Sequence, residues 1–393
     1  MLKFVQRLVA PKPSPIGVSL GTETLRLAQA QRIDGQWRLL AAAEAEVPIE
    51  ARKDLPSRLN FFEDMVKTIL SHGEFVGRQA VLGMPAAMMC AQHLRLPKMD
   101  LESLRKALPW ELRGKMPIDP ARALMRHIVA GEVYQDKEPS LEVIVLAAPK
   151  ESIQKYVKAA ERVRLDVVGM ESDPLAIVNC IGPAFWGKDV DPVIGIVDIG
   201  AVGTRVVLVQ GQNVLFARFI AIGGERIAKA VAAALGISEE QANAMQRASS
   251  ALRAVDAGGV ETGGNGDGGV TAVAATDAGR GEPPGHAVLE RLVEELELCR
   301  RYHDAAFSNR PIERLVFVGG GAKQRAWCQY VARRLNIAAQ VGDALTQIAK
   351  PADQLVVGSV DMRQPQPAWG VAIGLSLGQP VRLESPAATG RMA

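Results

Sequence analysis

Cysteine is scarce in this sequence, and the few cysteines stand far apart. There are four in 393 residues, Cys90, Cys180, Cys299 and Cys328, and none forms a Cys-x-x-Cys pair or stands in a cluster of histidines. Disulfide-stapled secreted domains and structural zinc sites both need cysteines at close, repeated spacings. The pattern therefore argues against both, and it predicts buried, reduced thiols in a cytosolic protein.

Long apolar runs and charge of a single sign are also missing. No apolar run approaches the roughly 18 residues that span a bilayer, and Pro11, Pro13 and Pro15 break the N-terminal stretch too early for a signal peptide. The net charge is +3, with no basic stretch interleaved with aromatic residues, which argues against nucleic-acid binding. The length of 393 residues predicts two domains, or two lobes of one.

The most informative stretch is residues 194–209, IGIVDIGAVGTRVVLV. An apolar run ends at Asp198, small residues follow from Gly200 to Gly203, and a second β-branched run begins after Thr204. This pattern predicts a strand, a tight turn and a second strand. Glycines let backbone N–H groups come close to an anion, and a carboxylate at a strand end can hold Mg²⁺ through water. An ordinary hairpin explains the stretch equally well, and no Gly-Lys-Ser/Thr loop is present to indicate a P-loop.

A second stretch, near the N-terminus, has the same outline. Residues 16–33 predict two strands around a turn that contains Ser19, Gly21 and Thr22, and Asp34-Gly35 is a strong hairpin signal leading into a third strand. Both stretches end a strand with a short polar side chain, one further residue and Gly. Their spacing of about 180 residues is too long for a solenoid and suits a duplicated domain.

Two further glycine clusters stand next to expected helices. Gly223-Gly224 precedes an amphipathic helix, and the strand at 314–318 ends in Gly319-Gly320-Gly321 before another helix. A helix N-terminus behind glycines suits an anion or a ribose edge, and a strand–glycine–helix platform suits a flat ligand or its phosphate. For Gly223-Gly224, a plain glycine turn is an equal alternative.

Three later segments predict structure rather than chemistry. Residues 256–287 are rich in Gly, Ala, Thr and Asp and poor in large apolar residues, which predicts a flexible insertion. His303 lies on the apolar stripe of the following helix, so we expect a packed core histidine rather than a catalytic one. Residues 368–377 predict a small-residue helix, with Gly370 and Gly374 on one face that permits close helix packing.

Together these motifs resemble the superfamily of actin, sugar kinases and heat-shock chaperone ATPases. Within it, the chain is most similar to the type IV pilus assembly protein PilM family, over nearly all of residues 1–378 apart from 256–287. FtsA-like division proteins share the superfamily features but fit the local segments less well. The segments that carry the resemblance are Ile16-Gly17-Val18-Ser19-Leu20-Gly21, Val81-Leu82-Gly83-Met84-Pro85 followed by Leu96-Pro97, Trp110-Glu111 with Met116-Pro117-Ile118, Glu142 to Ala148 with Lys150-Glu151, Ile222-Gly223-Gly224, and Val318-Gly319-Gly320-Gly321-Ala322.

The resemblance implies an α/β fold of the actin-like (ribonuclease H-like) type, with duplicated domains and four subdomains. One of these would be the extra interaction subdomain of PilM and FtsA, seated on the N-terminal lobe. The implied boundaries are 1–85 and 166–193 for lobe 1, 86–165 for the extra subdomain, 194–365 for lobe 2 with the insertion, and 366–393 for a closing helix of lobe 1 and a disordered tail.

The resemblance also implies a site for ATP and Mg²⁺. In the superfamily, two phosphate-binding β-hairpins face each other across a cleft, and a glycine platform holds the adenosine. Asp198 would hold Mg²⁺ through water. Asp173, which precedes Pro174, falls where related proteins place a water-positioning acid, with a helix-capping role as the alternative. The implied nucleotide-binding residues are Ser19, Gly21, Thr22, Asp198, Gly200, Gly203, Thr204, Gly224, Gly319, Gly320 and Gly321.

One departure from the family pattern concerns the first hairpin. Where the family has an aspartate, this chain has Ser19. Losing one of two carboxylates that position hydrated Mg²⁺ would weaken that positioning by about 1–3 kcal/mol. We therefore expect ATP binding, whereas ATP hydrolysis is left open.

The implied function is a cytoplasmic nucleotide-binding scaffold of a type IV pilus, or related type II secretion, machine, with weak or absent ATPase activity. It would dock at the cytoplasmic face of the inner membrane by binding the N-terminal cytosolic peptide of a PilN-like protein. A homo-oligomer or filament is left open. Two alternatives stay open: an FtsA-like polymerising protein, although an amphipathic C-terminal helix is missing, and a small-molecule kinase, although no clear general base is present.

Overall fold

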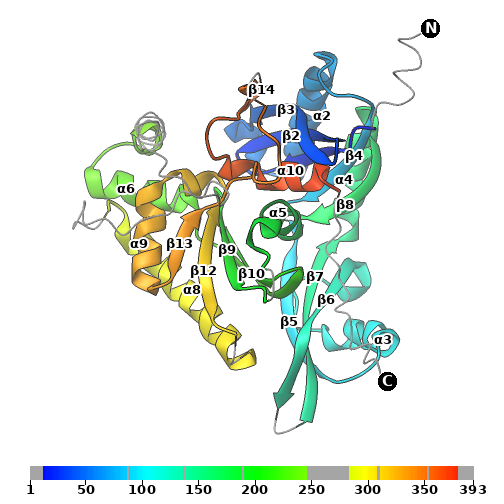
Figure 1. The fold of residues 1–393 in the computed structure, drawn as a ribbon, viewed down its shortest axis with the longest axis vertical. Coiled ribbons are helices and arrows are strands. Elements are labelled where there is room, and N and C mark those ends of the chain that lie inside the picture. Colours follow the sequence, from blue (N-terminus) through cyan, green and yellow to red (C-terminus); the bar gives the residue numbers. More distant parts are fainter. Residues whose placement is uncertain are drawn as a thin grey trace. The chain divides into compact units, whose positions relative to one another are not determined.

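The computed structural model describes most of the chain as two compact units (Figure 1). Residues 256–282 of the expected insertion lie outside the described residues, and so does the expected tail after residue 378. The described residues are 12–85, 88–135, 138–187, 190–245, 283–307, 310–351 and 354–378. Of the described residues, the first unit contains those in Met1–Pro85, Gln154–Ala184 and Asp343–Pro380, and the second those in Ala86–Ile153 and Phe185–Gly342. No helix in the described ranges is long and apolar enough to cross a membrane.

The first unit is built on a five-stranded sheet with the order β3-β2-β1-β4-β8. β1, β2 and β3 form an antiparallel meander, and β4 and β8 continue the sheet in parallel. The β2–β3 turn has positive φ at Asp34 (51°) and Gly35 (79°), as Asp-Gly hairpins require, so the predicted meander is confirmed. The strands are β1 (Ile16–Leu20), β2 (Thr24–Ile33), β3 (Gln36–Glu46), β4 (Gln79–Met84) and β8 (Asp166–Ser172).

Helices α2 (Leu55–Ser71) and α4 (Lys150–Arg162) supply much of the core of this unit. Phe62 of α2 and Tyr156 of α4 meet edge to face, with their ring centroids 5.3 Å apart. Their buried neighbours come from β1, β2 and β4. The extra subdomain was expected to extend to residue 165, but from Gln154 onward the chain belongs to the first unit, because this apolar face of α4 is buried there.

Close contacts at glycines join β1 and two short helices, α5 (Asp173–Ile181) and α10 (Gly370–Ser376). A Cβ on Gly374 would lie 1.9 Å from the Ala176 carbonyl oxygen, and one on Gly17 would lie 2.0 Å from that of Ala372. The predicted close packing at Gly374 is thus confirmed. The remaining elements of the unit are β14 (Val356–Val357), β15 (Val360–Asp361), and the 3₁₀ helices η1 (Ile49–Arg52), η4 (Gly182–Phe185, which runs into the second unit) and η7 (Pro367–Trp369).

The second unit repeats the first sheet strand for strand. Its order is β11-β10-β9-β12-β13, with β9, β10 and β11 antiparallel and β12 and β13 parallel to β9. Every residue of β9 is buried, as a central strand covered on both faces requires. The predicted duplication is therefore confirmed. The strands are β9 (Val193–Ile199), β10 (Thr204–Gln210), β11 (Asn213–Ile220), β12 (Ile312–Val318) and β13 (Ala338–Val341).

Helices α6 (Gly224–Leu235), α8 (His286–Ala306) and α9 (Arg325–Leu335) accompany this sheet. The predicted apolar stripe of α8 is buried along its length. His303 on that stripe is fully buried, and its Nε2 lies 2.6 Å from the Arg310 carbonyl oxygen. It is a core histidine, as expected.

A third sheet, with the order β5-β7-β6, also belongs to the second unit. Helix α3 packs Leu104 and Leu108 onto it, against Leu94 and Val143. The elements of this subdomain, residues 86–153, are β5 (Cys90–Pro97), α3 (Leu101–Glu111), the 3₁₀ helix η3 (Pro120–Arg122), β6 (Ala123–Gln135) and β7 (Glu138–Pro149).

The subdomain packs on β11 and α8 of the second unit. The ring of His93 stacks on Phe216 with centroids 4.6 Å apart, and its Nε2 lies 2.9 Å from the Ala217 carbonyl oxygen. The Tyr302 hydroxyl donates to Glu142. The resemblance had placed this subdomain on the N-terminal lobe, and these buried contacts are the physical reason that it groups with the second unit instead.

Candidate functional site

The β9–β10 hairpin places Asp198 at the carboxyl edge of the second sheet. The turn closes through the Gly200 N–H, which donates to the Gly203 carbonyl oxygen over 2.9 Å. Asp198 lies beside Val318, the last residue of the parallel strand β12. Asp198 and the triple glycine therefore meet at the carboxyl ends of neighbouring parallel strands, the edge at which α/β sheets bind ligands.

Two residues of the triple glycine, Gly319 and Gly321, must be glycine because their backbone lies close to β9. Gly319 has a φ of +84°, and a Cβ on it would lie 2.2 Å from Asp198 Oδ1. A Cβ on Gly321 would lie 2.4 Å from Ile199 Cγ2, whereas one on Gly320 would have no atom within 4 Å. A short 3₁₀ helix, η6 (Gly320–Lys323), separates this turn from α9. Of the three expected platform residues, Gly320 alone has open space above it.

The N-terminus of α6 is held by the same hairpin turn. The N–H groups of Gly224 and Glu225 donate to the carbonyl oxygens of Gly200 and Ala201, each over 2.9 Å. A Cβ on Gly223 would lie 2.4 Å from the Ala201 carbonyl oxygen. These two N–H groups, which an open helix N-terminus offers to an anion, are here already bonded within the protein.

Thr204 and Gly203, both expected to contact nucleotide, have internal partners. The Thr204 side chain is fully buried, and its Oγ1 donates to the Ile222 carbonyl oxygen over 2.7 Å. A Cβ on Gly203 would lie 2.3 Å from the Phe219 ring. Both residues thus stabilise the hairpin through contacts within the protein.

Arg205 is a residue that the sequence analysis missed. It is the direct cross-strand partner of Asp198 in the β9–β10 register, and its guanidinium forms an ion pair with the Asp198 carboxylate. The Asp198 side chain is 4% exposed and that of Arg205 is 16% exposed. The signal was available: in a hairpin closed between Gly200 and Gly203, residues 198 and 205 face each other.

These residues do not fit the hydrated Mg²⁺ expected at Asp198. The carboxylate is neutralised by Arg205 on one oxygen and lies against Gly319 on the other. Ser19 brings no charge, and within the described ranges no group of three His, Cys, Asp or Glu side chains is arranged to hold a metal ion. Mg²⁺ favours anionic oxygen ligands or their bound waters, and this ion pair offers no net negative charge.

In the first unit, the β1–β2 hairpin carries the other expected residues. Its turn closes through the Gly21 N–H, which donates to the Thr24 carbonyl oxygen over 2.9 Å. Ser19 and Thr22 are partly exposed. The cross-strand partner of Ser19 is Arg26, whose Nε donates to Glu44 on β3 over 2.5 Å.

Asp173 lies at the carboxyl edge of the first sheet. It is the first residue of α5, whose N-cap position is held by Ser172, so the capping alternative does not describe it. It is buried, and a Cβ on Gly83 of β4 would lie 2.9 Å from its Oδ1 and 3.3 Å from the Val18 carbonyl oxygen. Burial, and to a lesser degree the charge of Asp173, raises the pKa of the Tyr156 hydroxyl.

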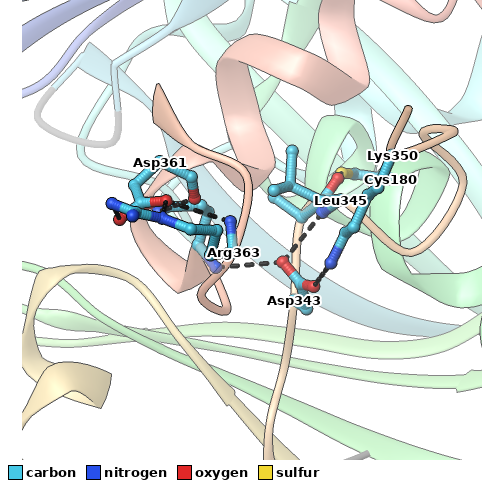
Figure 2. Close-up of polar contacts among 8 residues, drawn as sticks. Cys180, Asp343, Leu345, Lys350, Asp361 and Arg363 are labelled. Carbon is cyan, nitrogen blue, oxygen red and sulfur yellow. Dashed lines mark hydrogen bonds and ion pairs between the residues drawn. The ribbon is translucent and has the colours of Figure 1, made fainter. Parts of the chain in front are cut away.

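Asp343 holds together the segment that follows β13 (Figure 2). One carboxylate oxygen accepts from the backbone N–H groups of Leu345 (3.0 Å) and Gln366 (2.9 Å), and the other from Lys350 Nζ (3.0 Å). Cys180 Sγ donates to the Ala344 carbonyl oxygen over 3.3 Å. Of these bonds, the one from Cys180 ties the segment to α5; the segment groups with the first unit, although the second lobe was expected to extend to residue 365.

Three of the four cysteines are buried, as the sequence analysis predicts, and Cys90 is not. All four are free; Cys180, Cys299 and Cys328 are buried, and Cys90 is partly exposed. Burial, together with the charge of Asp343, raises the pKa of the Cys180 thiol. A protonated thiol in this position is unreactive.

Glu142 is the centre of a buried polar cluster in the second unit. It is fully buried and accepts from Tyr302 and, over 3.3 Å, from Arg95 Nε, with His93 Nδ1 at 3.5 Å. Burial opposes its ionisation, yet the hydrogen bonds from His93 and Tyr302 and the charge of Arg95 hold its pKa below the ordinary value. The ionised carboxylate therefore fastens the third sheet to α8.

Comparisons with known proteins agree with this architecture. The family described as "Type IV pilus assembly protein PilM" matches residues 17–254, more than half of the chain. Among solved structures, the chain is similar to a "PilM-PilN type IV pilus biogenesis complex", with 20% identity, 93% of this chain and 98% of that chain covered, and a TM-score of 0.68. It is also similar to the ethanolamine utilization protein EutJ from Carboxydothermus hydrogenoformans, with 13% identity, coverage of 94% and 90%, and a TM-score of 0.49. A search of curated protein sequences finds no significant match.

The duplicated sheets, their strand order and the likeness to the PilM-PilN complex confirm the predicted α/β fold with duplicated domains. The family match extends from β1 through the β9–β10 hairpin and α6. It thus includes both hairpins, the third sheet and the α6 N-terminus. The chain belongs to the type IV pilus assembly protein PilM family.

Proposed function

We propose that this chain is a nucleotide-binding scaffold of a type IV pilus machine, or of a related type II secretion machine, with weak or absent ATP hydrolysis. The observation that carries the proposal is the family match across both glycine hairpins. Nucleotide would be held at the carboxyl edge of the second sheet, by the turn at 200–203 and the glycines at 319–321, with Ser19, Gly21 and Thr22 of the first hairpin as further contacts. Asp173 is the proposed water-positioning acid of any residual hydrolysis.

The proposed partner is the N-terminal cytosolic peptide of a PilN-like inner-membrane protein, which would hold the chain at the cytoplasmic face of that membrane. Support comes from the likeness to a PilM-PilN complex. Within the subdomain at 86–153, the side chains of Trp110 and Tyr134 are 74% and 73% exposed. Exposed aromatic side chains are enriched where proteins bind one another.

Nucleotide binding is tested by calorimetry with ATP on the full chain. We expect binding by the wild type with little turnover. Ser19→Asp restores the family's acid and reports whether hydrolysis was lost at that position. An absence of binding to the wild type would reject the nucleotide part of the proposal and leave an actin-shaped adaptor.

Partner binding is tested by fluorescence anisotropy with a labelled N-terminal peptide of the PilN-like protein encoded by the same genome. We expect Trp110→Ala to weaken binding by roughly 10-fold or more, as truncating an aromatic anchor does. Trp186→Ala is the matched control, because Trp186 is also exposed (43%) and lies outside the subdomain. Equal affinities of the two variants would place the peptide elsewhere.

A further inference from the structure

We propose that Arg58 of α2 forms a binding site for a phosphate group in the first unit. Arg58 is on the buried face of the helix and is only 9% exposed. Its Nε is buried without a hydrogen-bond partner, and its side chain forms no hydrogen bond or ion pair with any described residue. Buried arginines are normally paired, because an uncompensated buried charge is costly. The site therefore lacks an anion that a ligand can supply.

Helix α2 itself gives Arg58 no acidic partner. An acid three or four residues away is the usual partner of an arginine within a helix. Of these positions, 54, 55, 61 and 62, only the first holds an acid. Asp54 is the N-cap of α2, and its carboxylate accepts from the Ser57 N–H over 2.8 Å. The carboxylate is thus used to end the helix rather than to neutralise the arginine.

A second arginine near Arg58 binds the acids of this part of the unit. Arg52 Nη1 lies 3.2 Å from Glu23 Oε1, and its Nη2 lies 3.6 Å from Glu46 Oε1. Burial, and after it the like charge of Arg52, lowers the pKa of Arg58. Arginine nevertheless stays protonated at neutral pH. Arg52 is therefore compensated, whereas Arg58 is a buried cation with another cation nearby.

The first turn of α2, which contains Arg58, lies near the turn of the β1–β2 hairpin. The Val47 N–H donates to the Glu23 carbonyl oxygen over 2.8 Å, and Arg52 binds the Glu23 carboxylate. These bonds fasten η1, which precedes α2 by two residues, to the hairpin turn. One buried cluster contains both residues of α2 next to Arg58 and residues that flank the hairpin turn: Leu59, Phe62, Leu20 and Leu25.

A phosphate group suits these surroundings. The planar fork of a guanidinium matches two oxygens of a phosphate. The hairpin also has partly exposed hydroxyl groups at Ser19 and Thr22, and hydroxyl groups are neutral donors that add no repulsion toward an anion. The phosphate group belongs either to the nucleotide proposed for this hairpin or to a free phosphate ion, and the two sources can be separated by experiment.

The first measurement is thermal denaturation of the full chain in sodium chloride and in sodium phosphate at equal ionic strength. Phosphate stabilises folded proteins in general, so the site is reported by the difference between wild type and Arg58→Met. The wild type should gain about 3 °C more than the variant at a phosphate concentration tenfold above its Kd. Without phosphate, Arg58→Met should melt no lower than wild type, because it replaces an uncompensated buried charge by an apolar side chain.

Two further variants are controls. Arg162→Met removes an arginine of the same unit that is paired with Glu63, and it should keep the full phosphate response of the wild type. Arg58→Lys keeps the positive charge and loses the planar fork. It should keep part of the response, which separates the charge at this position from the shape of the side chain.

Calorimetry with ATP identifies the source of the phosphate group. If the source is the nucleotide, Arg58→Met should weaken ATP binding by roughly 10-fold. If Arg58→Met binds ATP as the wild type does, or if the wild type binds none, an Arg58-dependent response to phosphate assigns the site to free phosphate. A wild type that binds no ATP would thus reject the nucleotide part of the proposed function and leave the phosphate site standing.

Two results would overturn the inference. Equal responses of wild type and Arg58→Met to phosphate would show that no phosphate binds at Arg58. A clear loss of stability in Arg58→Met without phosphate, or its failure to fold, would show that the guanidinium is compensated within the protein.

Discussion

The two hairpins of this protein have the same register and differ in what their arginines bind. Each turn closes with one N–H to carbonyl bond of 2.9 Å, from Gly21 to Thr24 in the first and from Gly200 to Gly203 in the second. Arginine stands at the same cross-strand position in both, opposite Ser19 in one and Asp198 in the other. Both hairpins therefore have an arginine at this position. Arg26 binds Glu44 on β3, whereas Arg205 binds Asp198 on the facing strand.

Burial separates the two ion pairs. The arginine side chains are similarly sheltered, at 15% exposed for Arg26 and 16% for Arg205, but Glu44 is 36% exposed and Asp198 only 4%. A partner near water can replace a lost ion pair by hydration, whereas a buried one cannot. The same substitution should therefore have very different costs in the two hairpins.

The largest expected effect comes from removing each arginine in turn. Arg205→Ala leaves the Asp198 carboxylate buried without its counterion, so we expect a loss of about 3–5 kcal/mol in the free energy of unfolding. Arg26→Ala is the matched variant and should cost at most about 1 kcal/mol. Urea denaturation of both measures the difference, and equal losses would show that the buried pair is not special.

A smaller effect is expected where the glycine platform meets Asp198 of the second hairpin. Gly319→Ala forces a side chain onto a φ of +84° and into the Asp198 carboxylate, which should cost about 2–4 kcal/mol. Gly320→Ala is the control, because a Cβ there meets no atom within 4 Å, and it should change stability by less than about 0.5 kcal/mol. Thermal denaturation of the pair tests this, and a tolerant Gly319 would contradict the close approach.

The smallest expected effect makes the first hairpin resemble the second. Ser19→Asp places a carboxylate opposite Arg26, which already binds Glu44. Because the new pair only competes with an existing one near solvent, stability should change by less than about 1 kcal/mol. A double-mutant cycle with Glu44→Gln measures the competition, and a large gain would mean that Arg26 prefers the cross-strand partner.

Much of the fold was predictable because its signals are local. The β2–β3 turn follows from Asp34-Gly35, the buried face of α8 from its apolar spacing, and the duplication from two stretches with one outline. The packing at Gly374 was likewise predicted from the spacing of small residues. Each of these depends on residues that are close in the sequence.

Most of what escaped prediction depends on contacts between residues far apart in the sequence. The Arg205–Asp198 ion pair is the exception, because it follows from the register of a single hairpin. The position of the subdomain at 86–153 depends on His93 stacking on Phe216 and on Glu142 meeting Tyr302, which no local pattern encodes. The same is true of the hydrogen bond between Asp343 and Gln366, which are 23 residues apart.

The bonds between the β9–β10 turn and α6 also have a mechanical consequence. The N–H groups of Gly224 and Glu225 donate to the carbonyl oxygens of Gly200 and Ala201. These hydrogen bonds couple the turn to the helix N-terminus. α6 has 12 residues, so the helix is about 18 Å long at 1.5 Å per residue. We therefore expect a ligand that shifts the turn to shift α6 with it, as far as Leu235.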